Sequence, residues 1–143
     1  MGKFEGRLRL ELAEDASGRP LTRGGRSLWA VDAPLVYDDG AYKISVPIGF
    51  ITDLASIPRG AWNLLPPDGP WAKAAVVHDF LYATKGTGIT SDGSCGITKP
   101  GGYTRAQADK VLDDAMAATG IGEVDRVEIF EGVRAGGEIG WGS

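Results

Sequence analysis

The sequence predicts an α+β fold: a small N-terminal antiparallel sheet or hairpin, an irregular loop, then two antiparallel helices and a short C-terminal helix. Three observations predict it. Apolar and polar residues alternate in the first third of the chain, a segment dense in glycine and proline follows, and helix-forming patterns occupy the remainder. With 143 residues and no linker or repeat that divides them, the chain is expected to fold as a single domain over residues 1–143.

The first third is predicted to be mostly β-structure. Residues 7–12, RLRLEL, place leucine at every second position, which is the pattern of a half-buried strand. Residues 34–50, PLVYDDGAYKISVPIGF, indicate a hairpin with its turn at residues 38–40. Its second strand alternates apolar residues that we expect to share one face, namely Tyr42, Ile44, Val46 and Ile48.

Residues 49–70, GFITDLASIPRGAWNLLPPDGP, contain too much glycine and proline for long regular structure. We predict an ordered, irregular loop whose backbone groups are satisfied by the short polar side chains of Thr52, Asp53 and Ser56. In TDLAS the plain interpretation is a turn that caps a short helix before Pro58. The functional interpretation places Asp53 near His78 as a second carboxylate.

A helix is predicted over residues 70–82, PWAKAAVVHDFLY, which contain the chain's only histidine. At 3.6 residues per turn, His78 and Tyr82 point to nearly the same place, whereas Asp79 is rotated by about 100°. A buried, hydrogen-bonded core histidine is the plain interpretation of His78. The carboxylate beside it and the phenol one turn later favour a functional one.

Residues 85–103 form a glycine-rich connector that we expect to be a hairpin, a lid or a contact loop. A second helix is predicted over residues 104–120, with Thr104 as its N-cap, Gln107 completing a capping box and Gly120 as its stop. Asp109 falls at the edge of the apolar stripe of this helix. A shorter helical pattern follows in EVDRVEIFEGVRAGG.

Composition excludes several classes of protein. The net charge of -4 and pI of about 4.9 argue against a broad nucleic-acid or anionic-lipid surface. One cysteine permits neither an intrachain disulfide nor a zinc site built from cysteine pairs. No signal peptide or transmembrane segment is evident, so we expect synthesis in a host cytoplasm.

A single histidine also limits the chemistry. Zinc peptidases of the His-Glu-x-x-His type and metal phosphohydrolases need more histidines, and the chain lacks a Gly-x-Ser-x-Gly elbow, a P-loop and a dinucleotide fingerprint. Only mechanisms that need one histidine remain, and in one of them the imidazole acts as a general base on water. In that scheme His78 is the base, Asp109 orients it, Tyr82 donates to Asp109, and Asp79 with Asp53 binds a divalent cation such as calcium.

Two resemblances bear on this scheme. HDFLY, followed by AD-x-x-L on a second helix, resembles the His-Asp-x-x-Tyr motif and downstream Asp of secreted phospholipases A2. That resemblance implies a His base, calcium at the adjacent Asp, and support of the His by the later Asp and the Tyr. It covers two helices.

A closer resemblance spans about two thirds of the chain. The blocks at residues 49–58, 78–82 and 105–109 match the pattern Gly-Phe-x-Thr-Asp-x-Ala-Ser-x-Pro, His-Asp-x-x-Tyr and Arg-x-x-Ala-Asp. This is similar to the phage-associated domain of unknown function 1353. The resemblance implies a bacteriophage or prophage origin.

Two functional hypotheses follow. In the first, a phage protein carries a phospholipase-like, metal-assisted hydrolytic site that acts on the host envelope. In the second, it is a non-catalytic virion component of the tail, baseplate or connector, and the His/Asp cluster is a polar staple between helices. Its partners would then be other virion proteins or further copies of itself. Solvent access at His78 separates the two hypotheses.

Overall fold

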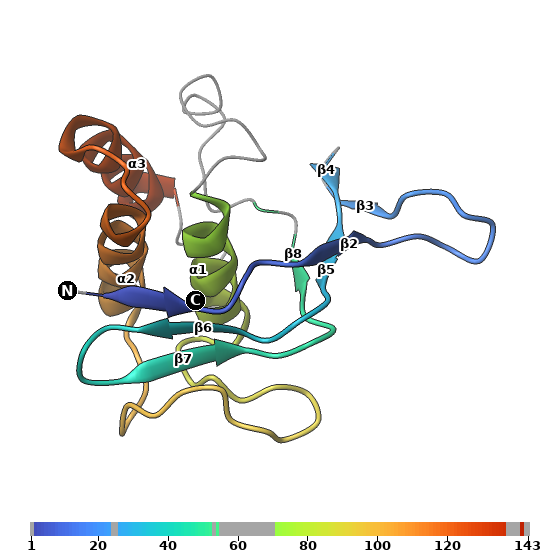
Figure 1. Ribbon diagram of the computed structural model, residues 1–143, viewed down its shortest axis with the longest axis horizontal. Helices are drawn as coiled ribbons and strands as arrows, with labels where there is room; N and C mark the ends of the chain where they lie inside the picture. Colours follow the sequence, from blue (N-terminus) through green and yellow to red (C-terminus); the bar gives the residue numbers. More distant parts are fainter. Residues whose placement is uncertain (1, 24–25, 53, 55–70, 137–140, 142–143) are drawn as a thin grey trace.

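The computed structural model describes residues 2–23, 26–52, 54, 71–136 and 141 (Figure 1). In these residues small antiparallel sheets come first and three helices follow, so the predicted α+β fold is confirmed. The helices are α1 (Ala72–Ala83), α2 (Arg105–Ala118) and α3 (Glu123–Gly136). Among the described residues, no helix is long and apolar enough to cross a membrane.

In the part of the chain that the structure describes, the β-structure comprises two three-stranded sheets and a two-stranded ribbon, and every strand pairing is antiparallel. The first sheet has the strand order β1 (Lys3–Glu5), β6 (Leu35–Asp38), β7 (Lys43–Val46). The second has the order β2 (Leu10–Leu12), β5 (Trp29–Val31), β8 (Ile51–Thr52). The ribbon pairs β3 (Thr22–Arg23) with β4 (Arg26–Ser27).

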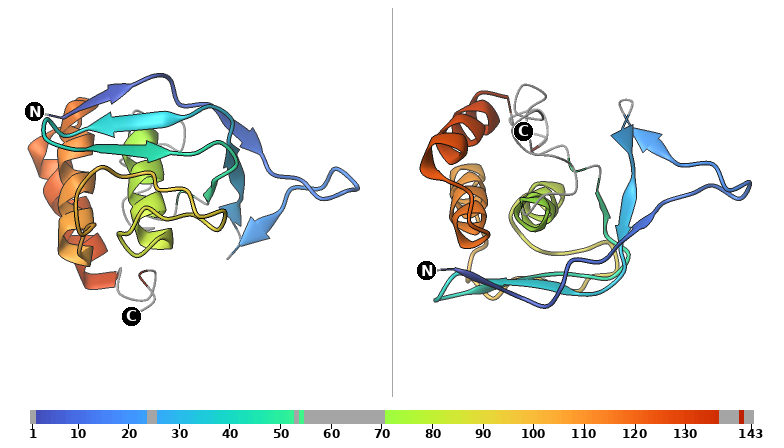
Figure 2. Two further views of the ribbon diagram at one scale, coloured as in Figure 1. Left: turned by 90° about the horizontal axis from the view of Figure 1, so that it is seen from below. Right: turned by 45° about the horizontal axis from the view of Figure 1, so that its top comes forward.

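The hairpin of β6 and β7 forms the floor on which the helices pack (Figure 2). Its turn is the predicted one, because Asp39 Oδ1 accepts hydrogen bonds from the backbone N–H groups of Ala41 and Tyr42 at 2.8 and 2.7 Å. Alternate residues of both strands are fully buried against the helices, namely Leu35, Tyr37, Ile44 and Val46.

Of the four residues predicted to share one face of the second strand, only two lie within β7. Ile44 and Val46 are buried, but Tyr42 and Ile48 are exposed. Tyr42 belongs to the turn, and Ile48 follows Pro47, beyond the last paired residue of β7. The alternation of a pleated strand does not extend past its paired residues.

Helix α1 is the centre of the molecule. It lies between α2 and the sheets, and it is buried nearly all round (Figure 2). Its small residues, Ala74 and Ala75, and its larger ones, Phe80 and Leu81, are all fully buried. A helix with apolar residues on every face is stable only when other elements cover it on several sides.

Helix α2 begins as the sequence predicts. The Thr104 hydroxyl accepts a hydrogen bond from the Gln107 backbone N–H at 3.1 Å, and the Gln107 side chain accepts one from the Thr104 backbone N–H at 2.8 Å. The helix ends before Gly120, whose φ of 90° suits a residue without Cβ.

The connector of residues 85–103 turns back along the free edge of β7. The Ser45 backbone N–H donates to the Gly96 carbonyl at 2.6 Å, and the Thr98 N–H donates to the Lys43 carbonyl at 3.1 Å. Ile89 pairs with Cys95 in an isolated bridge. The connector is therefore a hairpin-like excursion that covers a sheet edge, one of the three forms expected of it.

Residues 13–23, here called the arm, project from the second sheet to the side of the molecule opposite α3 (Figure 1). Hydrogen bonds within the arm and to Leu28 hold its base together: Ala13 N–H to Leu28 O at 2.9 Å, Leu21 N–H to Ala13 O at 2.8 Å, and Leu28 N–H to Leu21 O at 2.9 Å. Every residue from 14 to 23 is exposed.

Candidate functional site

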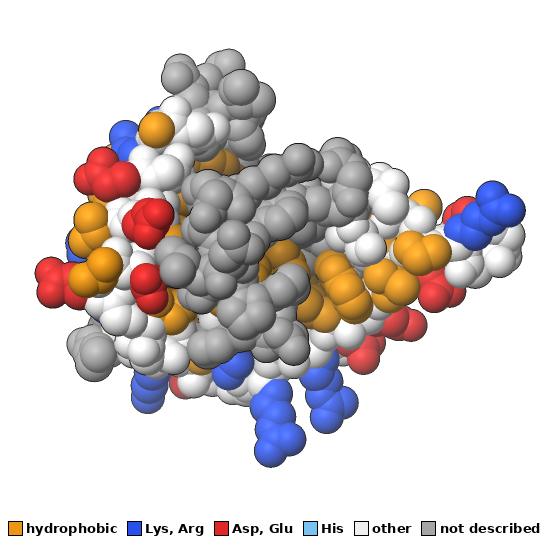
Figure 3. Space-filling view, turned by 90° about the horizontal axis from the view of Figure 1, so that it is seen from above, with side chains coloured by type: hydrophobic (Ala, Val, Ile, Leu, Met, Phe, Trp, Pro, Cys, Tyr) orange, Lys and Arg blue, Asp and Glu red, His pale blue; other side chains and the backbone are white. Residues whose placement is uncertain are grey.

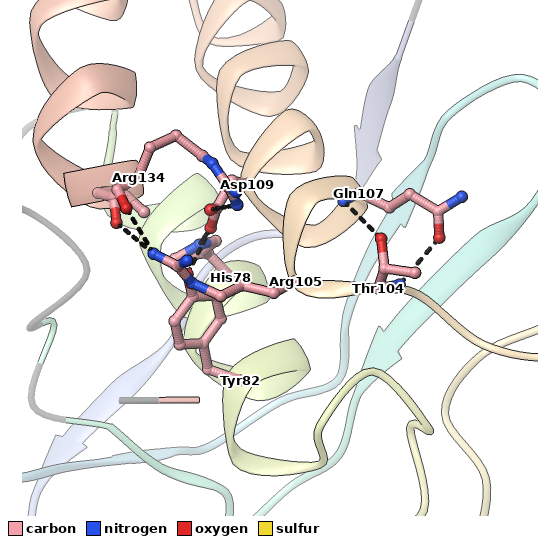
Figure 4. A network of polar contacts seen from close by, with 8 residues as sticks. His78, Tyr82, Thr104, Arg105, Gln107, Asp109 and Arg134 are labelled. Atoms are coloured by element: carbon pink, nitrogen blue, oxygen red, sulfur yellow. Dashed lines mark hydrogen bonds and ion pairs between the residues drawn. The ribbon is translucent and has the colours of Figure 1, made fainter. Parts of the chain in front are cut away.

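The polar cluster begins with a contact between α1 and α2. His78 Nε2 lies 2.8 Å from Asp109 Oδ1 (Figure 4). His78 is 1% exposed and Asp109 is 0% exposed. The predicted juxtaposition of these two residues, 31 positions apart, is therefore present. Because Asp109 is fully buried, it lies inside the packed interface of α2 and not at the edge of its apolar stripe.

Tyr82 joins the same carboxylate oxygen. One turn after His78, its hydroxyl donates to Asp109 Oδ1 at 2.6 Å, and the two rings lie 4.3 Å apart between centroids. Helical spacing accounts for this arrangement, since residues i and i+4 lie on one face. Trp141 packs edge-on against the Tyr82 ring at a centroid distance of 5.0 Å.

A third helix completes the cluster through a residue that sequence reasoning missed. Arg134, near the end of α3, donates from Nη1 to Asp109 Oδ2 at 2.7 Å. Its side chain is 36% exposed, so the cluster reaches the surface on this side. A signal was available: a carboxylate predicted near an apolar face needs a cation, and Arg134 directly follows the apolar spacing of Ile129 and Val133.

Arg105 fixes the position of α3 from outside the cluster. Its Nη2 donates to the carbonyl oxygens of Val133 and Arg134, at 3.1 and 2.7 Å, and its Nε donates to the Tyr82 hydroxyl at 3.3 Å. Helix ends leave carbonyl groups without partners inside the helix, and cations are favourable there. Arg105 thus links the C-terminal turn of α3 to Tyr82.

Electrostatics favour a charged Asp109 and a neutral Tyr82. Burial raises the pKa of Asp109, but hydrogen bonds from His78, Tyr82 and Arg134 outweigh burial and hold this pKa below its ordinary value. Burial, followed by the hydrogen bond to Asp109, raises the pKa of Tyr82 to about 12. The cluster is therefore a buried carboxylate held by the Tyr82 phenol, the His78 ring and the Arg134 guanidinium.

Of the two predicted metal ligands, Asp79 and Asp53, the structure describes only Asp79. Asp79 faces β8, where the Thr52 hydroxyl donates to its Oδ2 and accepts from the Leu54 backbone N–H at 3.1 Å. Asp53 lies outside the described residues, as do Ser56 and Pro58. Within the described ranges, no three His, Cys, Asp or Glu side chains are arranged to hold a metal ion.

Calcium takes six to eight oxygen ligands. Of its two predicted ligands only Asp79 is described, and one oxygen of that carboxylate already accepts from Thr52. The other predicted ligand, Asp53, lies outside the described residues, so the metal site stays a prediction.

The arrangement is that of an oriented imidazole. A carboxylate on Nε2 holds the ring in one position and favours the proton on that nitrogen in the neutral form. Base chemistry would then have to use Nδ1. Two features of the structure oppose a base role: the ring is almost fully buried, and the carboxylate charge that would support an imidazolium is shared with Arg134.

Comparison with known proteins gives a family and one relative. The family model described as "Protein of unknown function (DUF1353)" matches residues 29–133, a range that contains His78, Tyr82 and Asp109 and ends one residue before Arg134. The "Uncharacterized protein y4jT" of Sinorhizobium fredii (strain NBRC 101917 / NGR234) is 33% identical over 72 residues, which are 48% of this chain and 21% of that protein. The match thus spans about a fifth of the length of this relative. No solved structure matches.

Proposed function

The chain belongs to the DUF1353 family of proteins of unknown function, and from this premise we propose that it is a non-catalytic structural component of a bacteriophage or prophage particle. In this proposal the His78, Tyr82, Asp109 and Arg134 cluster is a clamp that fixes the three helices relative to one another. The particle origin rests on the phage-associated motif blocks described above. The clamp rests on the geometry of the cluster.

One observation carries the clamp. Asp109 is fully buried on α2, and both of its oxygens are occupied by side chains from the other two helices. A buried carboxylate is tolerated only when it is paired and hydrogen-bonded. The helices can therefore pack closely only in the arrangement that delivers these three partners to Asp109.

A double-mutant cycle on His78→Ala and Asp109→Ala tests the clamp. Each single variant should unfold at lower urea concentration, His78→Ala by roughly 1 to 3 kcal/mol because it leaves a buried carboxylate short of a partner. The coupling between the two changes should be at least about 0.5 kcal/mol. Asp114→Ala is the matched control, since Asp114 lies on α2 but is exposed. Additive effects would overturn the clamp.

The place in a particle is tested separately. Antibodies against the chain, or mass spectrometry, should detect it in purified particles of the phage that encodes it. Particles that lack the chain, prepared from a lysate that contains it, would overturn the structural role.

One observation favours a hydrolase as the second candidate. The Asp109 carboxylate contacts His78 Nε2, and the Tyr82 hydroxyl donates to that carboxylate. A histidine that activates water needs a carboxylate that orients its ring in this way. In this candidate function His78 activates water, and Asp109 and Tyr82 orient the His78 ring. The substrate is an envelope phospholipid. Calcium at Asp79 and Asp53 belongs to this candidate alone.

Fatty-acid release from phosphatidylcholine and phosphatidylglycerol vesicles, with calcium or with a chelator, separates the two candidates. We expect the wild-type chain and His78→Gln to give the same background rate. The contrary result is fatty-acid release by the wild-type chain and by Asp114→Asn but not by His78→Gln. It would establish the hydrolase and overturn the clamp as the sole role of the cluster.

A further inference from the structure

The outward face of α3 carries two valines among glutamates. Val124 is 82% exposed and Val127 is 53% exposed, which is unusual for large aliphatic side chains at neighbouring positions of a surface helix. Exposed glutamates lie around them on the same face, namely Glu123, Glu128 and Glu131. Within the described part of the chain none of these glutamates forms an ion pair.

Residues 19–23 of the arm carry the complementary pattern, beside the exposed Glu14 and Asp15. Leu21 is exposed, with Arg19 two residues before it and Arg23 two residues after it. In extended chain, side chains two apart point to the same face, so we expect Leu21 to share a face with Arg19 and Arg23. Neither arginine has a carboxylate partner within the residues described here.

The two surfaces lie at opposite ends of the molecule. Figure 1 places α3 at one end and the arm at the other, and Figure 3 shows acidic and hydrophobic side chains together with some basic ones at the α3 end, and basic side chains beside acidic ones on the arm. The arm therefore cannot reach α3 of its own chain. A contact between them joins two molecules.

We propose that the arm of one copy docks on the outward face of α3 in the next copy, so that the chain assembles head to tail. Leu21 then packs on Val124 and Val127, while Arg19 and Arg23 pair with the surrounding glutamates. A contact between two different surfaces repeats from copy to copy and gives a ring or a filament. The proposal goes beyond the clamp, uses none of its residues, and is tested by different measurements.

The spacing of the charges supports a second copy as the occupant. Four residues of extended chain separate the two arginines by about 13 Å. Eight residues of helix separate Glu123 from Glu131 by about 12 Å. Two positive charges thus flank the apolar residue of the arm, and two negative charges flank the valines of α3, at nearly the same separation. Charge matching of this kind sets orientation and register more than affinity.

Sedimentation velocity over a concentration series tests the assembly. The contact is small, so we expect weak, concentration-dependent growth beyond the monomer, reduced at high salt because exposed charges are screened there. A wild-type chain that stays monomeric up to millimolar concentration at low salt would overturn the proposal.

Charge-swapped variants test which surfaces meet. Arg19→Glu/Arg23→Glu and Glu128→Arg/Glu131→Arg should each associate more than about 100-fold more weakly than the wild-type chain, because like charges then face each other. Mixed in equal amounts, the two variants should assemble again, since each arm now matches the other variant's helix. Variants that assemble alone, or a mixture that does not, would contradict the docking.

Matched controls reverse the same number of charges elsewhere on the surface. The control for the arm variant is Lys3→Glu/Arg7→Glu, which changes the net charge by the same amount. The control for the helix variant is Glu11→Lys/Asp32→Lys, which also matches its change in net charge. All four residues are exposed. Both controls should assemble as the wild-type chain does. If they lose assembly to the same extent, net charge and not docking governs association, and the proposal is wrong.

Cross-linking provides a test that does not depend on reversed charges. In a Cys95→Ser background, which removes the exposed free thiol, one chain carries Leu21→Cys and the other Val127→Cys. Mild oxidation of the mixture should give a disulfide-linked heterodimer in clear excess over either homodimer. Equal yields of all three species would contradict the proposed pairing.

Discussion

Asp109 is the residue on which the polar cluster depends, because it is the common acceptor of three side chains. At residue scale the sequence predicted two of these donors correctly. His78 and Tyr82 are one helical turn apart, and this periodicity can be read directly from the chain. Arg134 lies 25 residues beyond Asp109, on a helix whose placement no local spacing specifies. A pairing of that kind depends on tertiary packing and could not be read from spacing alone.

Asp109→Asn should destabilise the fold by about 3 to 5 kcal/mol, because it leaves the Arg134 guanidinium and the His78 ring facing a neutral amide in a buried site. Urea unfolding at pH 7 measures the change. Asp114→Asn, on the exposed face of α2, should alter stability by less than about 0.5 kcal/mol. Equal effects of the two variants would show that Asp109 has no special role.

The stabilising effect of Asp109 should disappear in acid. Its pKa is lower in the folded chain than the ordinary value, so the unfolded chain binds the proton more tightly. Stability is then fully present above pH ~4 and is lost as the pH falls through the folded pKa. The free energy gap between the wild-type chain and Asp109→Asn should narrow below pH ~4. His78, Tyr82 and Arg134 face this carboxylate, and a gap that stays constant would contradict their hydrogen bonds to its charged form.

Two buried tyrosine hydroxyl groups lie outside the cluster. Within the described residues, those of Tyr37 and Tyr103 have no hydrogen-bond partner, and burial raises both pKa values to about 12. Removing an unsatisfied buried hydroxyl costs little, so Tyr37→Phe and Tyr103→Phe should be neutral or stabilising. Tyr82→Phe, which removes a donor to Asp109, should be destabilising. Thermal melts of the three variants rank them, and an equal loss in all three would be the contrary result.

At the scale of single elements, α3 is held at its C-terminal turn by a residue of α2. Arg105 donates to two of its last carbonyl oxygens, and the helix places only Ile129 and Val133 in the buried core. With so few buried residues, α3 relies on polar contacts more than α1 does. The sequence predicted α3 as a short helical pattern, but nothing in its spacing pointed to Arg105 as its anchor.

Arg105→Ala should therefore loosen α3 selectively. Amide hydrogen exchange should become faster in the C-terminal half of α3 while the amides of α1 keep their protection. Arg105→Lys should restore only part of the protection, since an ammonium group cannot reproduce the forked contact. A uniform rise in exchange over all three helices would argue that Arg105 supports the whole core instead.

Gly96 lets the connector approach β7 closely. A Cβ at Gly96 would collide with the Ser45 carbonyl oxygen and lie 2.8 Å from Phe80 Cζ. Gly96→Ala should cost about 1 to 3 kcal/mol, because the backbone contact to β7 cannot give way without losing a hydrogen bond. Gly122→Ala is the control, since a Cβ there meets nothing within 4 Å. Urea unfolding of both variants checks the difference.

At the scale of the whole molecule, the sequence predicted that β-structure precedes the helices but not how the strands combine; the irregular loop predicted between them lies mostly outside the described residues. The pairing of β2 with β5, and of β1 with β6, joins segments separated by long stretches of chain. Short strands such as β3 and β4 carry no alternating pattern to read. Ile48 is the opposite case: it belongs to an alternating sequence pattern but is exposed, because it lies beyond the paired residues of β7.

The arm should be dispensable for folding, because residues 14–23 bury nothing. Replacing residues 14–20 by Asn-Gly should change the free energy of unfolding by less than about 1 kcal/mol, since shortening an exposed loop has a small entropic effect. The same variant should sediment as a monomer. A large loss of stability would show that the arm belongs to the core.

The central position of α1 has a consequence for biosynthesis. Its residues leave the ribosome before those of α2 and α3, so His78 is made well ahead of Asp109 and Arg134. During that interval a strongly apolar segment has no helical neighbours to cover it. We therefore expect the nascent chain to be most exposed to aggregation and to chaperones before α2 and α3 have packed onto α1.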